Sequence, residues 1–213
     1  MIVYSGFEAL DVFGPLQVFN LLANNVTMTL SVIASSLEPV SIRESSPNSV
    51  GSTFSQEIVP THTYNNAPPL DLLIVPGGVA TTTAPEVAEA VDFVAARYPS
   101  LQYIMSICSG SHILARAAIL DGKSAATKKA LFDKATIEMP EVSWVMGEKW
   151  VVDGNIWTAS NTSVGMDAAL ALIAEVYGTE QAKAIMNYME YDGETSPMDD
   201  LLLGALNTTS SYV

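Results

Sequence analysis

The sequence predicts one α/β domain of three layers, in which helices cover both faces of a mostly parallel sheet. Three observations lead to this prediction. The chain has 213 residues, 49% of them hydrophobic, which suits a sizeable core. Two short apolar runs have the pattern of buried strands, and each is followed by a segment with helical spacing. This alternation, with no linker and no internal repeat, favours right-handed crossovers between parallel strands.

The N-terminal part begins with a short buried strand at residues 1–4, followed by a helix in "FGPLQVFNLLANN". Pro15 suits the first turn of this helix. Three apolar residues lie near helical spacing: Leu16, Phe19 and Leu22. The alternating, β-rich stretch 26–35 predicts another strand. Ser, Pro and Thr are frequent in 39–63, where we expect hairpins and loops.

The middle of the chain contains the two apolar strands. The first, at 70–75, is stopped by Pro-Gly-Gly, and the second occupies 101–107. The segment 84–99 between them is an amphipathic helix, because three valines line one side and acidic residues dominate the other. These valines are Val87, Val91 and Val94. A further helix is expected over 109–120, directly after the second strand.

The C-terminal part predicts a hairpin and two helices. Asp153-Gly154 between β-rich runs is a strong hairpin signal. A long buried helix follows over 163–178, with Gly178 as its C-terminal cap, and a last helix covers 179–192.

We expect residues 1–193 to form a single domain and residues 194–213 to form a C-terminal tail. The start of the sequence lacks a basic region followed by an apolar run, so no signal peptide is indicated. The sequence contains no run of about 18 apolar residues, the length that a transmembrane helix requires. A single cysteine fits a reducing compartment, and the expected location is the cytoplasm.

Charge and composition narrow the choice of partners. The net charge is −14, and nine Lys and Arg residues offer no obvious basic patch. Binding to nucleic acid or to an anionic membrane surface is therefore not expected. Charged residues make up only 15% of the chain, which favours burial of part of the surface in an oligomer.

The only cysteine, Cys108, lies where an apolar strand ends at Ile107 and a helix begins within one or two residues. In hydrolases this strand–turn–helix arrangement raises a nucleophile above the sheet. Ligands of open α/β sheets bind beyond the carboxyl ends of the strands. A helix N-terminus at this point is expected to lower the pKa of the thiol. Lone cysteines are usually buried apolar residues, but this position favours a functional thiol.

Two further features belong beside this cysteine. If the two apolar strands are neighbours, the Gly77-Gly78 turn lies next to the cysteine turn, and its amides could donate to a developing anion. Asp11 stands between apolar residues, so burial is expected to raise its pKa and keep it protonated as a general acid. The alternative for Asp11 is a cap of the helix that begins at Pro15, and local sequence slightly favours that alternative.

Four motifs resemble the DJ-1/PfpI superfamily, in the same order and from Met1 to about Tyr191. These motifs are LDVFGPLQVF, DLLIVPGG, ICSGSHILARAAILDGKSAAT and TASNTSVGMDAALALIAEVYG. They are most similar to its isocyanide hydratase branch and to the related sensor domains of AraC-type regulators. The resemblance implies a flavodoxin-like three-layer α/β/α sandwich and a homodimer.

The resemblance also implies roles for individual residues. Cys108 corresponds to the nucleophile, and Asp11 corresponds to the acidic residue that hydrogen-bonds it. The Gly77-Gly78 turn and the amide of Ser109 correspond to the border of the site. Aspartate before the "xxGPxxVF" pattern is typical of the hydratase-like variant, whereas many other relatives have glutamate at the acidic position.

The sequence departs from the family pattern at the histidines. Many relatives have a histidine shortly after the helix that follows the cysteine turn, or elbow, where this chain has Lys128. The protease-like branch has a histidine directly after the cysteine, where Ser109 stands here. His112, four residues past the cysteine, is a minor candidate for the site. A cysteine–histidine dyad is therefore disfavoured, and a thiolate assisted by one carboxyl group fits the residues present.

The implied function is the hydration of an isocyanide to an N-substituted formamide through a thioimidate on Cys108, with Asp11 as general acid. Ser109 and Asn161 are candidate polar contacts in an apolar pocket. We expect no cofactor and no metal, because two histidines and one cysteine give no ligand spacing. The alternatives are a non-catalytic or redox-sensing protein, and a glyoxalase or another hydratase-lyase of the same superfamily.

Overall fold

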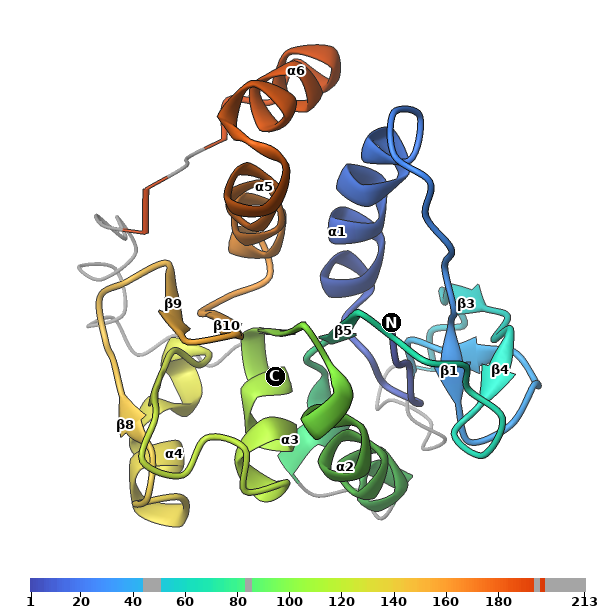
Figure 1. Cartoon of the computed structure of the whole chain (residues 1–213). Coiled ribbons are helices and arrows are strands. Elements are labelled where there is room, and N and C mark those ends of the chain that lie inside the picture. The colour runs from blue at the N-terminus through green and yellow to red at the C-terminus, as the bar shows by residue number, and fades with distance from the viewer. Residues whose placement is uncertain (44–50, 83–85, 194–195, 198–213) are drawn as a thin grey trace.

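The computed structural model describes residues 1–43, 51–82, 86–193 and 196–197. Its centre is a sheet with the strand order β5-β6-β10-β9 (Figure 1). The four strands are β5 (Leu72–Val75), β6 (Tyr103–Ile107), β9 (Trp150–Asp153) and β10 (Ile156–Ala159). Strands β5, β6 and β10 are parallel, and β9 is antiparallel to β10. The sheet is thus mostly parallel, as the sequence predicts.

The extended N-terminal segment runs along the free edge of β5. The Ile2 amide donates to the Ile74 carbonyl oxygen at 3.1 Å, and the Met1 carbonyl oxygen accepts from the Ile33 amide at 2.9 Å. On its other side lies β1 (Ile33–Ala34), which is parallel to β4 (His62–Thr63). The strand expected over 26–35 is therefore reduced to two residues, since most of the residues before it are exposed.

Two small pairs of strands complete the β structure. They are the antiparallel pair β2 (Val40–Ser41) with β3 (Glu57–Ile58) and the parallel pair β7 (Ser124–Ala125) with β8 (Ser143–Trp144). The β2–β3 pair agrees with the hairpins expected in 39–63, of which residues 44–50 lie outside the described residues.

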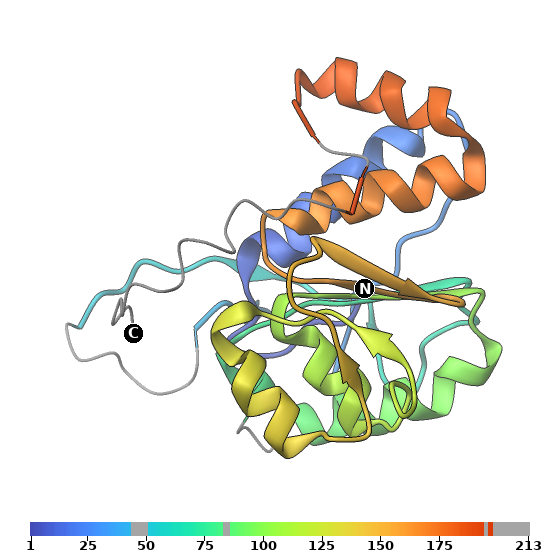
Figure 2. The ribbon, with the colours of Figure 1, turned by 90° about the vertical axis from the view of Figure 1, so that its left-hand side faces the viewer.

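Helices cover both faces of the sheet, which gives the three-layer α/β/α arrangement that the sequence predicts (Figure 2). One face carries α1 (Ala9–Leu22), α5 (Val164–Tyr177) and α6 (Thr179–Met189). The other face carries α2 (Glu86–Arg97), α3 (Ser111–Arg116) and α4 (Phe132–Glu138). Short 3₁₀ turns are η1 (Val79–Thr82), η2 (Tyr98–Ser100), η3 (Cys108–Gly110) and η4 (Lys129–Leu131).

Helix α1 begins earlier than the sequence suggests, because its first residue is Ala9 and Pro15 lies inside it. Proline has no N–H, so the carbonyl oxygen four residues before it lacks the usual helical bond. Val18 and Leu22 are fully buried, whereas Leu16 is only partly buried. Of the expected apolar residues, Leu22 is thus fully buried and Leu16 and Phe19 are partly buried, and the helix packs against α5.

The segments after β6 and β9 differ in how well the sequence predicts them. The helix expected over 109–120 starts with the turn η3 and, as α3, ends at Arg116. The hairpin at Asp153-Gly154 is confirmed: β9 and β10 pair across it, and Gly154 has a φ of 63°. The cap at Gly178 is confirmed by its φ of 93°, which favours glycine.

Most of the tail expected at 194–213 lies outside the described residues, but the Pro197 carbonyl oxygen accepts a bond of 2.8 Å from the Lys149 amide. Within the described residues, no helix is long and apolar enough to cross a membrane.

Candidate functional site

The cysteine lies on a strained turn at the carboxyl edge of the sheet. Strand β6 ends at Ile107, and Cys108 has a φ of 56°, in the left-handed region that residues other than glycine rarely adopt. The turn continues through Gly110 into α3. The elbow predicted from the sequence is therefore present, and strain of this kind is common at functional sites.

The elbow is held against the end of β5 by close packing. A Cβ atom on Gly110 would overlap the Val75 carbonyl oxygen and lie 2.8 Å from the Pro76 carbonyl oxygen, so only glycine fits there. The Ser109 hydroxyl accepts a bond of 3.1 Å from the Gly78 amide. Because β5 and β6 are adjacent and parallel, the two turns meet side by side, as the sequence predicts.

Asp11 reaches this point from the first turn of α1. Its side chain is fully buried, and its Oδ2 accepts a bond of 2.8 Å from the Gly77 amide. Its Oδ1 has no hydrogen-bond partner among the described residues. The interpretation of Asp11 as a helix cap at Pro15 is wrong, because Glu8 occupies the N-cap position and Asp11 lies within the helix.

The environment of Asp11 brings the titration of its carboxyl group close to neutral pH. Burial raises its pKa to about 7, and the Gly77 amide and the Thr162 hydroxyl oppose this effect by favouring the carboxylate. The negative charge of Glu8 raises the pKa of Asp11 further, and the positive charge of Lys128 lowers it. The sequence predicts that desolvation raises the pKa of this carboxyl group, and the environment of Asp11 agrees with that prediction.

Burial also raises the pKa of the Cys108 thiol to about 11, and the charge of Asp11 raises it further. Lys128, the Ser109 amide and the Thr162 hydroxyl lower it, but they do not reverse the shift. The expected lowering by a helix N-terminus is wrong here. Helix α3 has only six residues, and desolvation outweighs the effect of so short a dipole.

Since the charge of Asp11 raises the pKa of the Cys108 thiol, the thiol and the carboxyl group titrate as a pair. Between pH of about 7 and about 11 the pair holds one proton. This single proton can reside on either group, so the pair can present a thiolate beside a carboxylic acid.

The polar residues after β10 divide their roles differently from the expectation. The Asn161 Oδ1 accepts from the Val164 amide at 3.1 Å and from the Ser163 hydroxyl at 2.8 Å, so this side chain binds the start of α5. Its neighbour Thr162 is the residue that influences both Asp11 and Cys108. The preference of asparagine for helix N-termini is a sequence signal that could have separated the two.

The two glycine amides are engaged within the protein: that of Gly77 binds Asp11, and that of Gly78 binds the Ser109 hydroxyl. The Ser109 amide, by contrast, acts on Cys108, whose pKa it lowers. Among the expected donors, the amide of Ser109 is thus the one that acts on the thiol.

His112 is buried and is not among the groups that act on Asp11 or Cys108. Its ring lies 6.1 Å from the ring of Trp144, and neither ring nitrogen has a hydrogen-bond partner among the described residues. Burial lowers its pKa to about 4, and the charges of Lys134 and Arg116 add to this effect. It is therefore neutral near pH 7.

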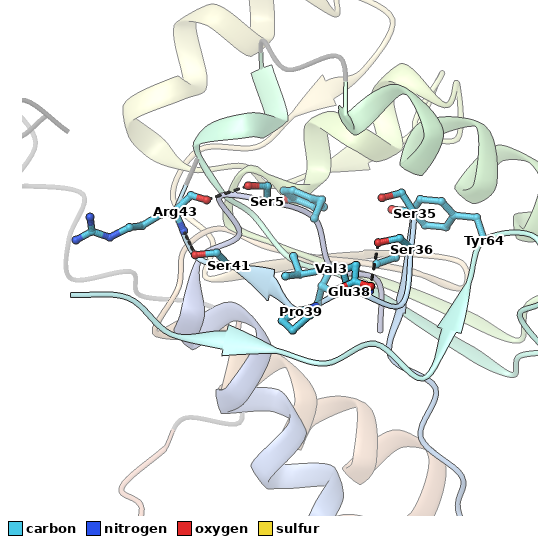
Figure 3. A pocket seen from close by; sticks show the side chains of 12 residues that line it. Val3, Ser5, Ser35, Ser36, Glu38, Pro39, Ser41, Arg43 and Tyr64 are labelled. Carbon is cyan, nitrogen blue, oxygen red and sulfur yellow. Dashed lines mark hydrogen bonds between the residues drawn. The ribbon is translucent and has the colours of Figure 1, made fainter. Parts of the chain in front are cut away.

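A hollow of about 380 Å³ opens around residues 3–5 of the N-terminal segment (Figure 3). Hydroxyl groups line it, from Ser5, Ser35, Ser36, Ser41, Tyr4 and Tyr64. The Arg43 side chain extends away from it and donates to the Phe54 carbonyl oxygen at 2.8 Å. Neither Cys108 nor Asp11 lines this hollow. Elsewhere in the described chain, no cluster of three His, Cys, Asp or Glu side chains is suited to hold a metal ion.

Known proteins with similar sequences include enzymes and regulators. Isonitrile hydratase from Pseudomonas putida is 28% identical over 213 residues, which are 100% of this chain and 84% of the hydratase. The HTH-type transcriptional regulator GbdR from Pseudomonas aeruginosa is 30% identical over 136 residues, which are 64% of this chain and only 36% of the regulator.

Solved structures agree with the fold. A ThiJ/PfpI family protein from Pseudomonas syringae is 30% identical, with a TM-score of 0.72 over 91% of this chain and 74% of that protein. DJ-1beta from Drosophila melanogaster is 18% identical, with a TM-score of 0.69 over 89% of this chain and 95% of that protein.

The sequence pattern of the DJ-1/PfpI family matches residues 1–175 of this chain, a range that includes both Asp11 and Cys108. A buried cysteine on a strained elbow, coupled to a carboxyl group from the first helix, is thus found in a chain that belongs to the DJ-1/PfpI family.

Proposed function

We propose that this protein is an isocyanide hydratase-like enzyme, a cysteine-dependent lyase that converts an isocyanide and water into an N-substituted formamide. The observation that carries the proposal is the buried pair of Cys108 and Asp11, which holds one proton between pH of about 7 and about 11. The similarity of the whole chain to an isonitrile hydratase supports the substrate class.

In the first step, the Cys108 sulfur forms a bond to the terminal carbon of the isocyanide. Asp11, in its acid form, gives its proton to that carbon, so no carbanion accumulates. The product of this step is a thioimidate, in which the carbon is bound to hydrogen, to sulfur and, through a double bond, to nitrogen. A thiol suits the step because it adds and leaves easily, and proton transfer of this kind contributes about 10²- to 10⁴-fold in rate.

In the second step, water adds to the thioimidate carbon. The Asp11 carboxylate takes one proton from the water, and the nitrogen receives the other. The carbon–sulfur bond then breaks, the carbonyl group forms, and the formamide leaves. Water has supplied one oxygen and two hydrogens, and the pair again holds one proton. The mechanism requires neither a metal nor an organic cofactor.

The test is a panel of isocyanides, with formamide measured in solution and an adduct on Cys108 sought by intact-protein mass spectrometry. Cys108→Ser should abolish turnover, and Asp11→Asn should fold but lose at least about 10²-fold in rate. His62→Gln, on β4 and outside the pair, is the matched control and should keep the full rate. Formamide production by Cys108→Ser would contradict the mechanism.

A second candidate is a binding or sensing protein without turnover, favoured by the 30% identity with a transcriptional regulator over 136 residues. In that case peroxide at low concentration would oxidise Cys108 to sulfinic acid while no isocyanide is consumed. Including methylglyoxal in the panel separates a glyoxalase from both candidates.

We further propose that the enzyme works as a homodimer in the cytoplasm and does not bind nucleic acid. The net charge of −14 supports the last point, because a negative surface repels phosphates.

A further inference from the structure

One buried tyrosine contacts the same peptide group that holds Asp11. The Tyr4 hydroxyl donates to the Pro76 carbonyl oxygen at 2.5 Å, and the Gly77 amide donates to Asp11 Oδ2 at 2.8 Å. The Pro76 carbonyl and the Gly77 amide belong to one planar peptide group. Tyr4 and Asp11 therefore bind opposite sides of a single rigid unit.

This peptide group is also fixed from the next residue. The Gly77 carbonyl oxygen accepts a bond of 2.9 Å from the Glu8 amide. Three residues of the N-terminal segment, Tyr4, Glu8 and Asp11, thus hold Pro76 and Gly77. Gly77 is also closely packed against its neighbours: a Cβ atom on this residue would lie 2.8 Å from the Asp11 Oδ2 and from the Ser109 amide nitrogen.

We propose that Tyr4 is a positioning residue for the acid: its hydroxyl orients and polarises the Pro76–Gly77 peptide group, and so determines how readily Asp11 releases its proton. A bond donated to a carbonyl oxygen makes the amide of the same peptide group a stronger donor. A stronger donor at Oδ2 stabilises the carboxylate form of Asp11. The proposal rests on the role of Asp11 in the proposed function and deepens it.

The tyrosine is well suited to this role. Its side chain is 4% exposed, and burial raises the pKa of its hydroxyl well above 10, with the charges of Asp11, Cys108 and Tyr64 adding to the effect. The hydroxyl therefore remains a donor through the whole working pH range. The charged groups that act on Asp11 are Glu8 and Lys128, whereas the Pro76 carbonyl oxygen accepts its side-chain hydrogen bond from Tyr4.

The test follows the titration of the pair through Cys108, the only thiol in the chain. The rate of alkylation by iodoacetamide is measured against pH for the wild type, Tyr4→Phe, Asp11→Asn and the double variant. Tyr4→Phe removes only the hydroxyl, so the Asp11 inflection should move upward by roughly half to one pH unit. In the Asp11→Asn background, Tyr4→Phe should cause no shift, because the group through which it acts is absent.

Tyr64→Phe is the matched control, since it removes a hydroxyl from the same hollow and its hydroxyl makes no bond to Pro76 among the described residues. Its profile should match the wild type. An unchanged Asp11 inflection in Tyr4→Phe, or an equal shift in the Asp11→Asn background, would overturn the proposal. A lower melting temperature with an unchanged profile would likewise assign Tyr4 a merely structural role.

A substitution in the opposite direction covers the case in which Tyr4→Phe does not fold. Incorporation of 3-fluorotyrosine at position 4 keeps the ring and strengthens the donor, so the Asp11 inflection should move downward; an unmoved inflection contradicts the proposal. Alkylation requires no substrate, so this test stands even if no isocyanide is hydrated. When formamide production is present, the acid limb of its pH profile should shift with the alkylation profile.

Discussion

The charge state of two side chains, Asp11 and Cys108, governs what this site can do. Burial raises the pKa of Asp11 to about 7 and that of Cys108 to about 11, so the ordinary resting form at pH 8 is a thiol beside a carboxylate. The reactive form has the same number of protons, with the proton moved from sulfur to oxygen. A histidine is not needed for this exchange, and His112 lies elsewhere, against Trp144.

This pairing predicts a bell-shaped pH dependence of kcat/KM for isocyanide hydration. Below pH of about 7 the pair gains a second proton, the thiolate is lost and the rate falls. Above pH of about 11 the pair loses its last proton, no acid remains and the rate falls again. Initial rates in overlapping buffers measure both limbs, and a rate that continues to rise from pH 7 down to pH 5 would contradict the assignment.

Single residues also show where reading the sequence reaches its limit. Cys108 is identifiable because the strand, the turn and the helix that define an elbow are adjacent in the chain. Asn161 and Thr162 are adjacent polar residues, and the sequence alone does not say which one turns toward the sheet edge. The structure assigns Asn161 to the start of α5 and Thr162 to the pair. For Tyr4 the sequence offers one signal: a tyrosine in a buried strand usually needs a hydrogen-bond partner for its hydroxyl.

At the level of secondary structure, the site depends on two turns that approach closely. The turn after β5 supplies Gly77 and Gly78, and the turn after β6 supplies Cys108 and Ser109. Both turns were predictable, because Pro-Gly-Gly and a lone cysteine each follow an apolar strand. The start of α1 was not predictable in this way. Pro15 suggested that the helix begins there, whereas α1 begins at Ala9 and Pro15 lies inside it.

Gly77→Ala should disrupt the site while leaving the fold in place. The added Cβ would lie 2.8 Å from the Asp11 Oδ2, the Ser109 amide nitrogen and the Ser109 hydroxyl oxygen, so the acid and the elbow must separate. A displacement of this size should reduce kcat by about 10²-fold. The control is Gly14→Ala in α1, where the nearest atom belongs to the flexible side chain of Met166. Circular dichroism checks the fold of both variants, and equal activity in the two would contradict this account of the turn.

For the whole molecule, the arrangement of layers followed from the alternation of strands and helices, and the family resemblance agreed with it. What the alternation leaves open is the surface. Apolar side chains remain exposed near the start of α1, with exposures of 44% for Leu10, 40% for Phe13 and 58% for Val79. The ring of Phe13 contacts that of Phe7, whose backbone pairs with Gly78, the residue before Val79.

A second copy of the chain is the expected cover of these residues. Light scattering should give a particle of twice 22.7 kDa, and Phe13→Glu should shift it toward the monomer, because a buried charge disfavours association. Ile137→Glu, at an exposed apolar residue on α4, is the control and should keep the dimer. A monomeric wild type at micromolar concentration would contradict the dimer.

The residues around Cys108 come from distant parts of the chain, and this affects when its thiol can be oxidised. Asp11 and Gly77 are 66 residues apart in sequence, and Tyr4 and Pro76 are 72 apart. Until these contacts form, the cysteine is an ordinary thiol in water, with a larger thiolate fraction than in the folded state. Oxidative damage at neutral pH should therefore strike the chain during synthesis and during transient openings of the native structure. Folding thus protects the sulfur, and the oxidised fraction of an aged sample records how often the molecules have opened.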